Sequence, residues 1–341
     1  MNPPSDYRRL RGPVLRSVSR SFYLSLRLLP KALRDPLSLA YLLARATDTI
    51  ADTPEPAADV RAEALQSLAS AILGKGSPET AVRLRDVFAP RQSDRAERAL
   101  IEALPSALEW LEALEETDRR EVRSVIGKIT RGQALDLERF DTSTSTSTST
   151  STSTSIKALQ TAAELDEYTY LVAGCVGEFW TRLCFIHVDN FSQRPELEMR
   201  ELGMEYGKGL QLINILRDAG SDLRQGRCYF PMDELRLAGV APNEILKSPE
   251  RVEPILGPWR EKAEHGLEAG IDYACAIRNR RTRFATALPA LIGARTLKLL
   301  REAGPNALER KVKVPRGEVR KMILSGALAS SRSLRAKFEK L

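Results

Sequence analysis

Histidine and cysteine, the side chains of most metal and nucleophile sites, are scarce in this sequence of 341 residues. Only two histidines occur, His187 and His265, which argues against a histidine-ligated zinc site and against a Ser-His-Asp triad. The four cysteines form no C-x-x-C pair and are scattered through the chain: Cys175, Cys184, Cys228 and Cys275. In so long a chain they do not indicate a disulfide framework, and we expect a reducing, cytoplasmic location.

Long apolar runs are also missing. The longest apolar stretches, such as Leu39–Ala44 and Ala287–Ala294, fall far short of the roughly 20 residues that span a bilayer. The first residues, Met1–Arg11, are polar and charged and contain no apolar stretch of the signal-peptide kind. The sequence therefore predicts neither a transmembrane helix nor a signal peptide.

The positive charge is concentrated at the C-terminal end. The chain has a net charge of +7, and residues 309–341 alone hold ten Lys or Arg against three Asp or Glu. Such a basic segment suits an anionic membrane surface, and a solvated helix face explains it equally well. Because no aromatic side chains alternate with the basic ones, nucleic acid is the weaker partner. We expect no nucleic-acid partner, at most peripheral contact with the inner face of a membrane, and a monomer.

Helical patterns dominate the chain. Apolar residues recur three and four apart among good helix formers in Val60–Leu73, Asp94–Glu115, Arg119–Ile129 and Trp259–Arg278. Pro, Gly, Asn and Asp cluster at the expected breaks, Asp52–Ala58, Gly74–Glu79, Gly239–Asn243 and Ala303–Asn306. Alternating β-branched runs are almost absent, and Lys311–Val314 is the one weak strand candidate. The sequence predicts an all-α fold with a single domain over residues 1–341.

One internal segment differs from the rest in composition. Residues 142–155 are seven consecutive Thr-Ser pairs. Thr and Ser disfavour helices, and the run has no strongly apolar side chain. It therefore predicts a flexible, solvated loop within the domain.

Two aspartates stand four residues apart at the end of one predicted helix. Asp48 and Asp52 project from the same helix face, where two negative charges destabilise the helix unless a cation lies between them. Mg²⁺ is the natural candidate because it prefers carboxylate oxygens and keeps positions for water and phosphate. A single D-x-x-x-D is common, and a solvated helix face is its ordinary interpretation.

A second pair ends another apolar helix far along the chain. Asp218 and Asp222 continue a polar stripe that begins at Gln211 and Asn214, and such a stripe needs polar or ionic partners. Two such pairs together are a much stronger signal than either alone. Facing each other across a helical bundle, they could hold several Mg²⁺ ions against a diphosphate and stabilise a departing pyrophosphate.

Four blocks, in this order, resemble the squalene and phytoene synthase family. They are Ser19-Arg-Ser21-Phe22, Arg45-Ala-Thr-Asp48-Thr-Ile-Ala-Asp52, Tyr168-Thr-Tyr-Leu-Val172-Ala-Gly174-Cys-Val176-Gly177, and the stretch from Gln211 through Asp222 to Gly226-Arg-x-Tyr229-x-Pro231. The resemblance runs from Ser17 to about Lys321. It implies an isoprenoid-synthase-type helical bundle with a central active-site cavity.

The resemblance also implies roles for these residues. Mg²⁺ would be held by Asp48, Asp52, Asp218 and Asp222, with Asn214 and Gln211 supporting the second cluster and the substrate. The diphosphate would contact Arg45, Arg217, Arg227, Ser19 and Ser21, and the rest of the substrate Phe22, Tyr41, Tyr229, Val172, Val176 and Gly177. Tyr168 would steer or relay the proton lost on ring closure; a buried tyrosine with a satisfied hydroxyl is the ordinary alternative. The small residues at 172–177 either leave room for apolar chains or pack helices closely.

The last motif bears on the product. Lys311-Val-Lys313-Val-Pro-Arg316-Gly317-Glu is similar to a basic motif of family members that make squalene with NADPH. No G-x-G-x-x-G follows a strand, so NADPH would bind a surface formed by helices, with Lys313 and Arg316 near its phosphates. A solvated basic turn explains these two residues equally well. The implied reaction joins two farnesyl diphosphates head to head, through presqualene diphosphate, to squalene. The alternatives are a phytoene, dehydrosqualene or presqualene diphosphate synthase, or a non-catalytic, membrane-associated helical scaffold.

Overall fold

The structure, a computed structural model, describes residues 5–19, 23, 26, 29–77, 79–140, 156–326 and 330–341. The predicted Thr-Ser loop at 142–155 lies outside these residues. By their internal contacts the residues fall into two compact units, Met1–Ser143 with Arg182–Val188, and Thr144–Thr181 with Asp189–Leu341. They are called unit 1 and unit 2 below. The single domain predicted for the whole chain stays a prediction.

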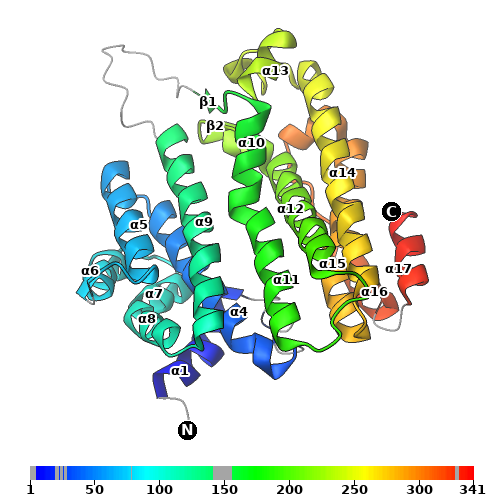
Figure 1. The fold of residues 1–341 in the computed structure, drawn as a ribbon. Helices are drawn as coiled ribbons and strands as arrows, with labels where there is room; N and C mark the ends of the chain where they lie inside the picture. The colour runs from blue at the N-terminus through cyan, green and yellow to red at the C-terminus, as the bar shows by residue number, and fades with distance from the viewer. Residues whose placement is uncertain are drawn as a thin grey trace, which may run out of the picture. The chain divides into compact units, whose positions relative to one another are not determined.

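Unit 1 is built of helices around α4 (Lys31–Asp52), which packs against α5 (Ala58–Ile72), α8 (Leu104–Glu112) and α9 (Glu116–Phe140) (Figure 1). The chain reaches α4 through α1 (Ser5–Arg9), a π-helix (Leu10–Val14) and α2 (Leu15–Ser19). Between α5 and α8 lie α6 (Glu79–Phe88), a 3-10 turn (Ala89–Arg91) and α7 (Arg95–Glu102). Buried leucines such as Leu39, Leu42 and Leu43 place the core along the inner side of α4.

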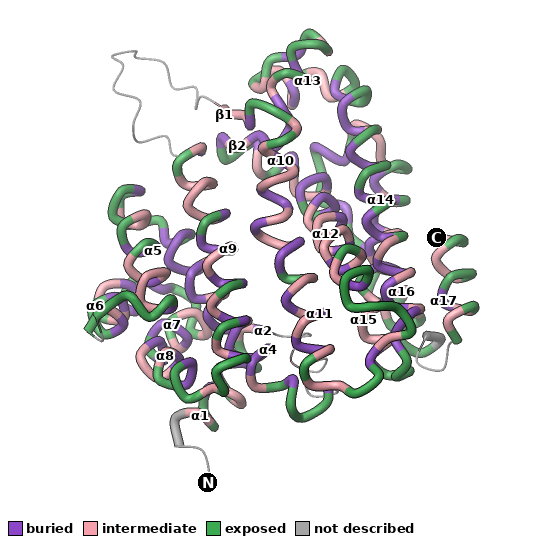
Figure 2. The backbone as a smooth tube through the Cα atoms, viewed as in Figure 1, coloured by how far each residue is buried: buried purple, intermediate pink, exposed green. Residues whose placement is uncertain are grey.

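Unit 2 is centred on the 29-residue helix α12 (Glu196–Arg224), which packs against α14 (Glu253–Ala276) and α15 (Arg280–Ala303). A continuous helical run leads to it: α10 (Ala162–Thr169), a π-helix (Tyr170–Gly174) and α11 (Cys175–His187), whose last turns belong to unit 1. After α12 come α13 (Met232–Leu237) and two 3-10 turns (Pro242–Glu244, Pro249–Val252). Following α15 are a further turn (Gly304–Leu308), α16 (Arg316–Gly326) and α17 (Ser331–Phe338). Buried residues recur along the whole of α12 and α14 (Figure 2).

Local sequence signals set several helix ends. The Asp94 side chain accepts hydrogen bonds from the backbone N–H groups of Ala96 and Glu97, which fixes the start of α7. Asn279 caps α15 in the same way, and Thr161 caps α10. These caps satisfy N–H groups that a helix start otherwise leaves without partners.

The all-α class is confirmed. The only strands among the described residues are β1 (Lys157–Ala158) and β2 (Arg227–Cys228), a parallel pair of two residues each. Two predictions were wrong in detail. The helix expected over Asp94–Glu115 is broken at Ala103, because Pro105 starts a new helix there. The strand candidate Lys311–Val314 has no strand partner in the structure, and its two valines are buried instead.

In the described part of the chain, no helix combines the length and the apolar character that a membrane crossing requires. All four cysteines are free thiols.

Candidate active site

The C-terminal turn of α4 carries the first aspartate pair. Asp52 is the last residue of the helix and is exposed, and the Asp48 side chain is 41% exposed. Negative charges are unfavourable at this end because the helix dipole is also negative there. Arg45, one turn earlier, donates from Nη1 to Asp48 Oδ2 at 2.6 Å. The Arg45 guanidinium contacts Asp48, and the charge of Asp52 also acts on Asp48, so this end of the helix is suited to a further cation.

The pKa of Asp48 reflects this crowding. Burial raises it, the negative charge of Asp52 raises it further, and together they take the pKa of Asp48 to about 6 although Arg45 opposes them. A carboxyl in this state is stabilised when a divalent cation takes the place of its proton.

Glu97 of α7 holds Arg45 in place. One oxygen, Glu97 Oε1, accepts hydrogen bonds from Arg45 Nε at 2.9 Å and from Nη2 at 2.5 Å. The other oxygen, Oε2, accepts from the Thr49 hydroxyl. The Glu97 side chain is only 16% exposed. Burial lowers the pKa of Arg45, but the hydrogen bond that Arg45 donates to Glu97 and the charge of Asp48 outweigh this and raise the pKa. The guanidinium is therefore fixed along one edge, and only Nη1 is directed at Asp48.

This contact leads to a first prediction. Replacing Glu97 by Gln is expected to lower kcat/KM about tenfold to a hundredfold, because Arg45 loses a charge-assisted, two-point contact that orients it. The measurement is steady-state turnover of farnesyl diphosphate, the substrate that the resemblance described above implies. Glu102→Gln, on the same helix and 3.8 Å from the exposed Arg9, is the matched control and should leave turnover unchanged. Equal rates for both variants would refute the role of Glu97.

The second aspartate pair lies near the end of α12. Gln211, Asn214, Asp218 and Asp222 follow one another along one side, as predicted, and Asn214 Nδ2 lies 3.4 Å from Gln211 Oε1. Asn214 is exposed, and Asp218 and Asp222 are half-buried. Asp218 accepts from Arg217 Nε at 3.1 Å and from Nη2, and Lys311 Nζ lies 3.6 Å from its Oδ1. Burial raises the pKa of Asp218, but Arg217 and then Lys311 outweigh it and lower the pKa below its usual value.

The donor chemistry fits Mg²⁺. Each helix presents two aspartates one turn apart, whose oxygens are the hard ligands this ion prefers. Within the described residues, no group of three or more His, Cys, Asp or Glu is placed to hold an ion. Two carboxylates per helix, with water and phosphate oxygens completing the octahedron, is the usual mode of Mg²⁺ in phosphate chemistry.

Tyr168 lies at the end of α10 and is 9% exposed. Its ring stacks on that of Tyr229, with centroids 5.1 Å apart, and the two hydroxyl oxygens are 3.5 Å apart. Tyr168 therefore has a hydroxyl partner, as the ordinary alternative for a buried tyrosine requires. The pair of phenols also provides two adjacent groups that can carry a proton.

The structure assigns part of the 172–177 block to helix packing. A Cβ built on Gly177 would lie 1.9 Å from Gly203 O on α12, so the two backbones touch there. In the same block Val172 is half-buried, and Val176 is 40% exposed. Close helix contact explains Gly177, and Val176 is the one member of the block that is exposed.

A family model described as squalene/phytoene synthase matches residues 15–318. The chain belongs to the squalene/phytoene synthase family. This is a family of prenyl transferases that condense prenyl diphosphates head to head. The match includes all four blocks identified in the sequence.

Individual relatives agree with this membership. The chain is 26% identical over 314 residues to 15-cis-phytoene synthase of Synechocystis sp., covering 89% of this chain and 79% of that protein. It is 28% identical over 235 residues to chloroplastic phytoene synthase 3 of Zea mays, covering 69% of this chain and 45% of that protein. The chain thus spans less than half of the maize relative.

Solved structures share the fold. TcSQS with the ligand BPH1237 matches with a TM-score of 0.75 and 19% identity, over 98% of this chain and 89% of that one. A dehydrosqualene synthase in complex with a ligand matches with a TM-score of 0.63 and 20% identity, over 98% and 97%. Squalene synthase HpnC from Alicyclobacillus acidocaldarius matches with a TM-score of 0.58 and 18% identity, over 88% and 94%. At these identities the likeness concerns the fold alone.

The remaining predicted residues of the family motifs are placed as follows. Ser19 is buried, and its hydroxyl donates to Leu15 O at 2.5 Å within its own helix. Tyr41 donates to Val18 O at 3.1 Å, and Ser21 and Phe22 lie outside the described residues. Arg227 lies on β2, opposite Lys157 of β1. Lys313 and Arg316 are both exposed.

Sequence reasoning missed two residues of this site. Glu97 is 52 residues from Arg45 in the chain, so no local pattern joins them. The D-x-x-E spacing from Asp94 to Glu97 predicts a helix start. It gives no indication that Glu97 also contacts Arg45. Lys311 is part of the basic motif identified in the sequence, but no pattern near it in the chain indicates its contact with Asp218.

Cys228, between Arg227 and Tyr229, allows a prediction about the thiols. Burial raises the pKa of Cys228 to about 12, so almost none of it is thiolate at pH 8. We expect it to react with iodoacetamide on the order of a thousandfold more slowly in the native than in the unfolded chain. Peptide mass analysis after timed labelling gives both rates, with half-buried Cys275 as an internal comparison that should react faster than Cys228. Rapid native labelling of Cys228 would contradict the burial described here.

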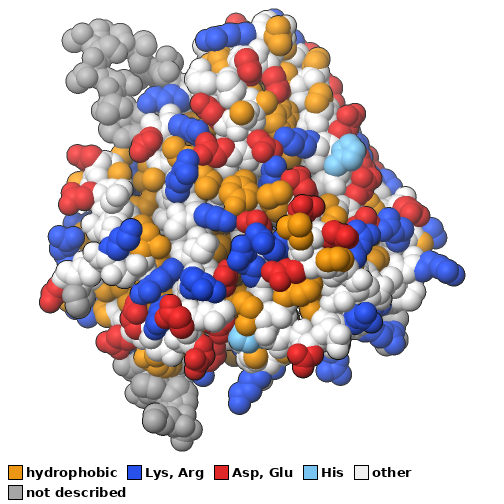
Figure 3. Space-filling view, in the orientation of Figure 1, with side chains coloured by type: hydrophobic (Ala, Val, Ile, Leu, Met, Phe, Trp, Pro, Cys, Tyr) orange, Lys and Arg blue, Asp and Glu red, His pale blue; other side chains and the backbone are white. Residues whose placement is uncertain are grey.

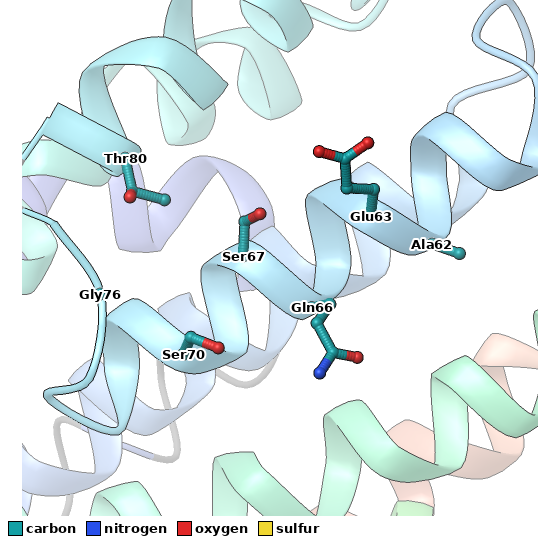
Figure 4. Close-up of a pocket in the computed structure, with 7 residues that line it drawn as sticks. All are labelled: Ala62, Glu63, Gln66, Ser67, Ser70, Gly76 and Thr80. Carbon is teal, nitrogen blue, oxygen red and sulfur yellow. The ribbon is translucent and has the colours of Figure 1, made fainter.

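The described residues of unit 1 line at least two clefts. The larger, of about 1380 Å³, lies at the N-terminal end of α4, and its lining includes Leu15, Leu26, Leu114 and Asp35. Asp35 precedes Asp48 by thirteen residues, ~20 Å along the helix axis. The smaller, of about 450 Å³, is lined mainly by α5 residues, with Thr80 of α6 and Gly76 (Figure 4). No predicted site residue borders either cleft.

Proposed function

We propose that this protein joins two farnesyl diphosphates head to head and reduces the product to squalene with NADPH. The pairing of acid and arginine on two helices carries the proposal: Arg45 with Asp48, and Arg217 with Asp218. An allylic diphosphate needs both kinds of group, since carboxylates bind its metal ions and guanidinium groups bind its oxygens directly.

The aspartates are assigned to metal binding. Asp48 and Asp52 on α4, and Asp218 and Asp222 with Asn214 on α12, would hold Mg²⁺, which neutralises the charge that develops on departing pyrophosphate. Arg45 reaches a phosphate oxygen through Nη1, since Glu97 occupies its other edge. Arg217 and Lys311 both contact Asp218. They therefore lie where they would also bind the oxygens of a diphosphate held at this aspartate.

Ring closure requires a proton acceptor. Forming presqualene diphosphate makes new C–C bonds between the two farnesyl groups, expels one pyrophosphate and releases one proton. We assign the relay of this proton to the Tyr168 hydroxyl, which lies 3.5 Å from the Tyr229 hydroxyl, and the expelled pyrophosphate is the final proton acceptor. Burial of both rings keeps water from the cation at this step. The apolar wall of the larger cleft, with Leu15, Leu26 and Leu114, is our candidate for the far end of a prenyl chain.

The reductive step requires NADPH. Val312 and Val314 are buried at 8% and 6% exposure, so the residues between and after them, Lys313 and Arg316, face solvent. These two exposed cationic side chains lie on a segment anchored by buried valines, and they suit the phosphates of a dinucleotide. Hydride from NADPH would quench the cation left by the second ionisation, with loss of the second pyrophosphate.

A second candidate function is favoured by one observation. The curated relatives described above are phytoene synthases. A phytoene synthase, a dehydrosqualene synthase or an enzyme that stops at presqualene diphosphate would use the same aspartates and the same tyrosine. It would not respond to NADPH by making squalene.

The test is incubation with farnesyl or geranylgeranyl diphosphate and Mg²⁺, with and without NADPH, followed by mass analysis of the extracted products. Squalene that forms from farnesyl diphosphate only with NADPH supports the proposal. Presqualene diphosphate, dehydrosqualene or phytoene regardless of NADPH replaces it by the second candidate. Turnover that persists in EDTA contradicts the metal assignment. Absence of turnover with either substrate favours the non-catalytic scaffold.

A further inference from the structure

The outer side of α16 combines exposed apolar and basic residues. Ile323 is 42% exposed and Leu324 is 79% exposed, so two adjacent large apolar side chains lie in contact with solvent. Arg320 and Lys321 on the same helix are also exposed. At ~100° per residue, these four side chains fall within a sector of ~160°. We call Arg320, Lys321, Ile323 and Leu324 the α16 face.

The opposite side of α16 is attached to unit 2. Glu318 accepts from Arg295 Nε of α15 at 2.8 Å, and Val319 and Met322 are half-buried. The helix is therefore not divided into one apolar and one polar side, as an ordinary amphipathic helix is. Its packed side carries an ion pair and two apolar residues, and its exposed side carries two further apolar residues among cations. Protein packing does not account for the exposed pair.

The segments on both sides of α16 are anchored. Val312 and Val314 before it are 8% and 6% exposed, and Leu334 of α17 after it is fully buried. Cys275 of α14 contacts the Ser331 carbonyl, and Arg335 pairs with Asp272 of α14. Together with the ion pair of Glu318 and Arg295, these contacts attach the start of α16 and the described segments on either side of it to unit 2. A helix attached in this way loses less conformational freedom on binding a surface than a free segment would.

The surroundings of the face are strongly basic. Residues 309–341 carry the whole net charge of the chain, +7. Lys and Arg side chains gather over the edge of the molecule where α17 lies (Figure 3). Their acidic neighbours are partly engaged, since Glu318 is paired with Arg295. A surface of this sign attracts anionic partners, and the attraction falls with ionic strength.

We propose that the α16 face docks this protein on an anionic lipid surface, with Ile323 and Leu324 inserted at the boundary between headgroups and acyl chains. Apolar side chains flanked by Lys and Arg are the residue types that bind in this interfacial plane. The long Arg and Lys side chains keep their charges at the phosphates while the aliphatic pair lies deeper. The inference goes beyond the proposed reaction and does not depend on it.

A lipid surface fits better than nucleic acid. Residues 309–341 contain a single aromatic side chain, Phe338, and it is half-buried. Single-stranded nucleic acid is bound through stacking on aromatic residues as well as through charge. Ile323 and Leu324 offer nothing to a base or a phosphate, whereas they match the apolar layer beneath lipid headgroups.

The test is co-sedimentation of the full chain with vesicles of phosphatidylcholine alone or with 30 mol% phosphatidylglycerol. We expect binding to the anionic vesicles only. Ile323→Ser with Leu324→Ser should weaken it on the order of tenfold. Arg320→Gln with Lys321→Gln should weaken it about 25-fold at low salt, since each surface charge contributes about fivefold. Leu237→Ser is the matched control, because Leu237 is 91% exposed on α13, outside the basic segment.

Circular dichroism and thermal melting should be unchanged in all variants, since every substituted side chain is exposed. Equal binding of wild type and both double variants would overturn the proposal. So would an equal loss in Leu237→Ser, or retention on a single-stranded DNA column with no sedimentation on vesicles. These outcomes are separate from turnover, because none of the four residues belongs to the proposed active site.

Discussion

Asp218→Asn is expected to lower kcat/KM for the prenyl diphosphate substrate by about a thousandfold. Asparagine keeps the shape of the side chain and one oxygen but removes the charge that attracts Mg²⁺. A metal ion at a departing phosphate contributes several kcal/mol, and about 4 kcal/mol corresponds to a thousandfold change in rate. Steady-state kinetics over a range of Mg²⁺ concentrations measure the loss. Partial recovery at high Mg²⁺ would show that metal affinity is what the substitution removed.

Asp48→Asn should lower turnover about as much as Asp218→Asn does. It should also raise the stability of the metal-free protein at neutral pH. The pKa of Asp48 is raised by burial and by Asp52 to about 6, above its ordinary value, so its ionised form destabilises the metal-free fold. Because the pKa of Asp48 is higher in the folded protein than in the unfolded chain, protonation of Asp48 stabilises the fold. This contribution to stability is present at low pH and is lost as the pH rises through about 6. In EDTA the melting temperature of Asp48→Asn should equal that of wild type at pH 4 and exceed it at pH 7.5.

Asp86→Asn serves as the control for both variants, because Asp86 is exposed and pairs only with its neighbour Arg85 among the contacts described here. It should change neither turnover nor melting. If Asp218→Asn or Asp48→Asn retained turnover within about threefold of wild type, the two aspartate pairs would not be the metal site.

Gly177→Ala is expected to lower the free energy of unfolding by about 3 kcal/mol, at the upper end of overpacking effects. The added Cβ would lie 1.9 Å from Gly203 O and 2.4 Å from Gly203 C, and both atoms are backbone. No rotamer change relieves such a contact, so α11 and α12 must move apart. Chemical denaturation with urea measures the change. A variant as stable as wild type would mean that the helices do not touch here and that Gly177 remains available to the substrate.

Gly127→Ala is the matched control for this substitution. Gly127 lies within α9, and a Cβ built on it meets only the Leu73 side chain, at an ordinary van der Waals distance of 3.6 Å. Alanine there removes the backbone freedom of glycine without displacing a neighbour, and should stabilise the protein by about 0.5 to 1 kcal/mol. Two Gly→Ala changes within helices thus have opposite expected signs, decided only by what lies opposite each glycine.

The sequence predicts contacts between residues that are close in the chain, and it does not predict contacts between residues that are far apart in the chain. The pairs Asp48–Asp52 and Asp218–Asp222 each lie on one helix, so their spacing alone places both carboxylates on one side. The contact of Glu97 with Arg45 joins α7 to α4, and Tyr229 reaches Tyr168 from 61 residues away. Composition leaves open whether small residues make room for a ligand or for another helix. Only the position of Gly203 resolves this for Gly177.

The π-helix at Tyr170–Gly174 changes what the tyrosine block can do. In an uninterrupted α-helix, Tyr168 and Gly177 would point in opposite directions, because nine residues rotate the chain by ~900°. The wider π turn takes up one extra residue and removes ~100° of that rotation. Tyr168 and Gly177 then lie on neighbouring sides, so that one continuous helical run can stack a phenol on Tyr229 and still touch α12 through a glycine. Deleting a single residue from this turn would restore regular winding and turn Tyr168 away from Tyr229, so the phenol would lose its partner although Tyr168 and Gly177 both remain in the chain.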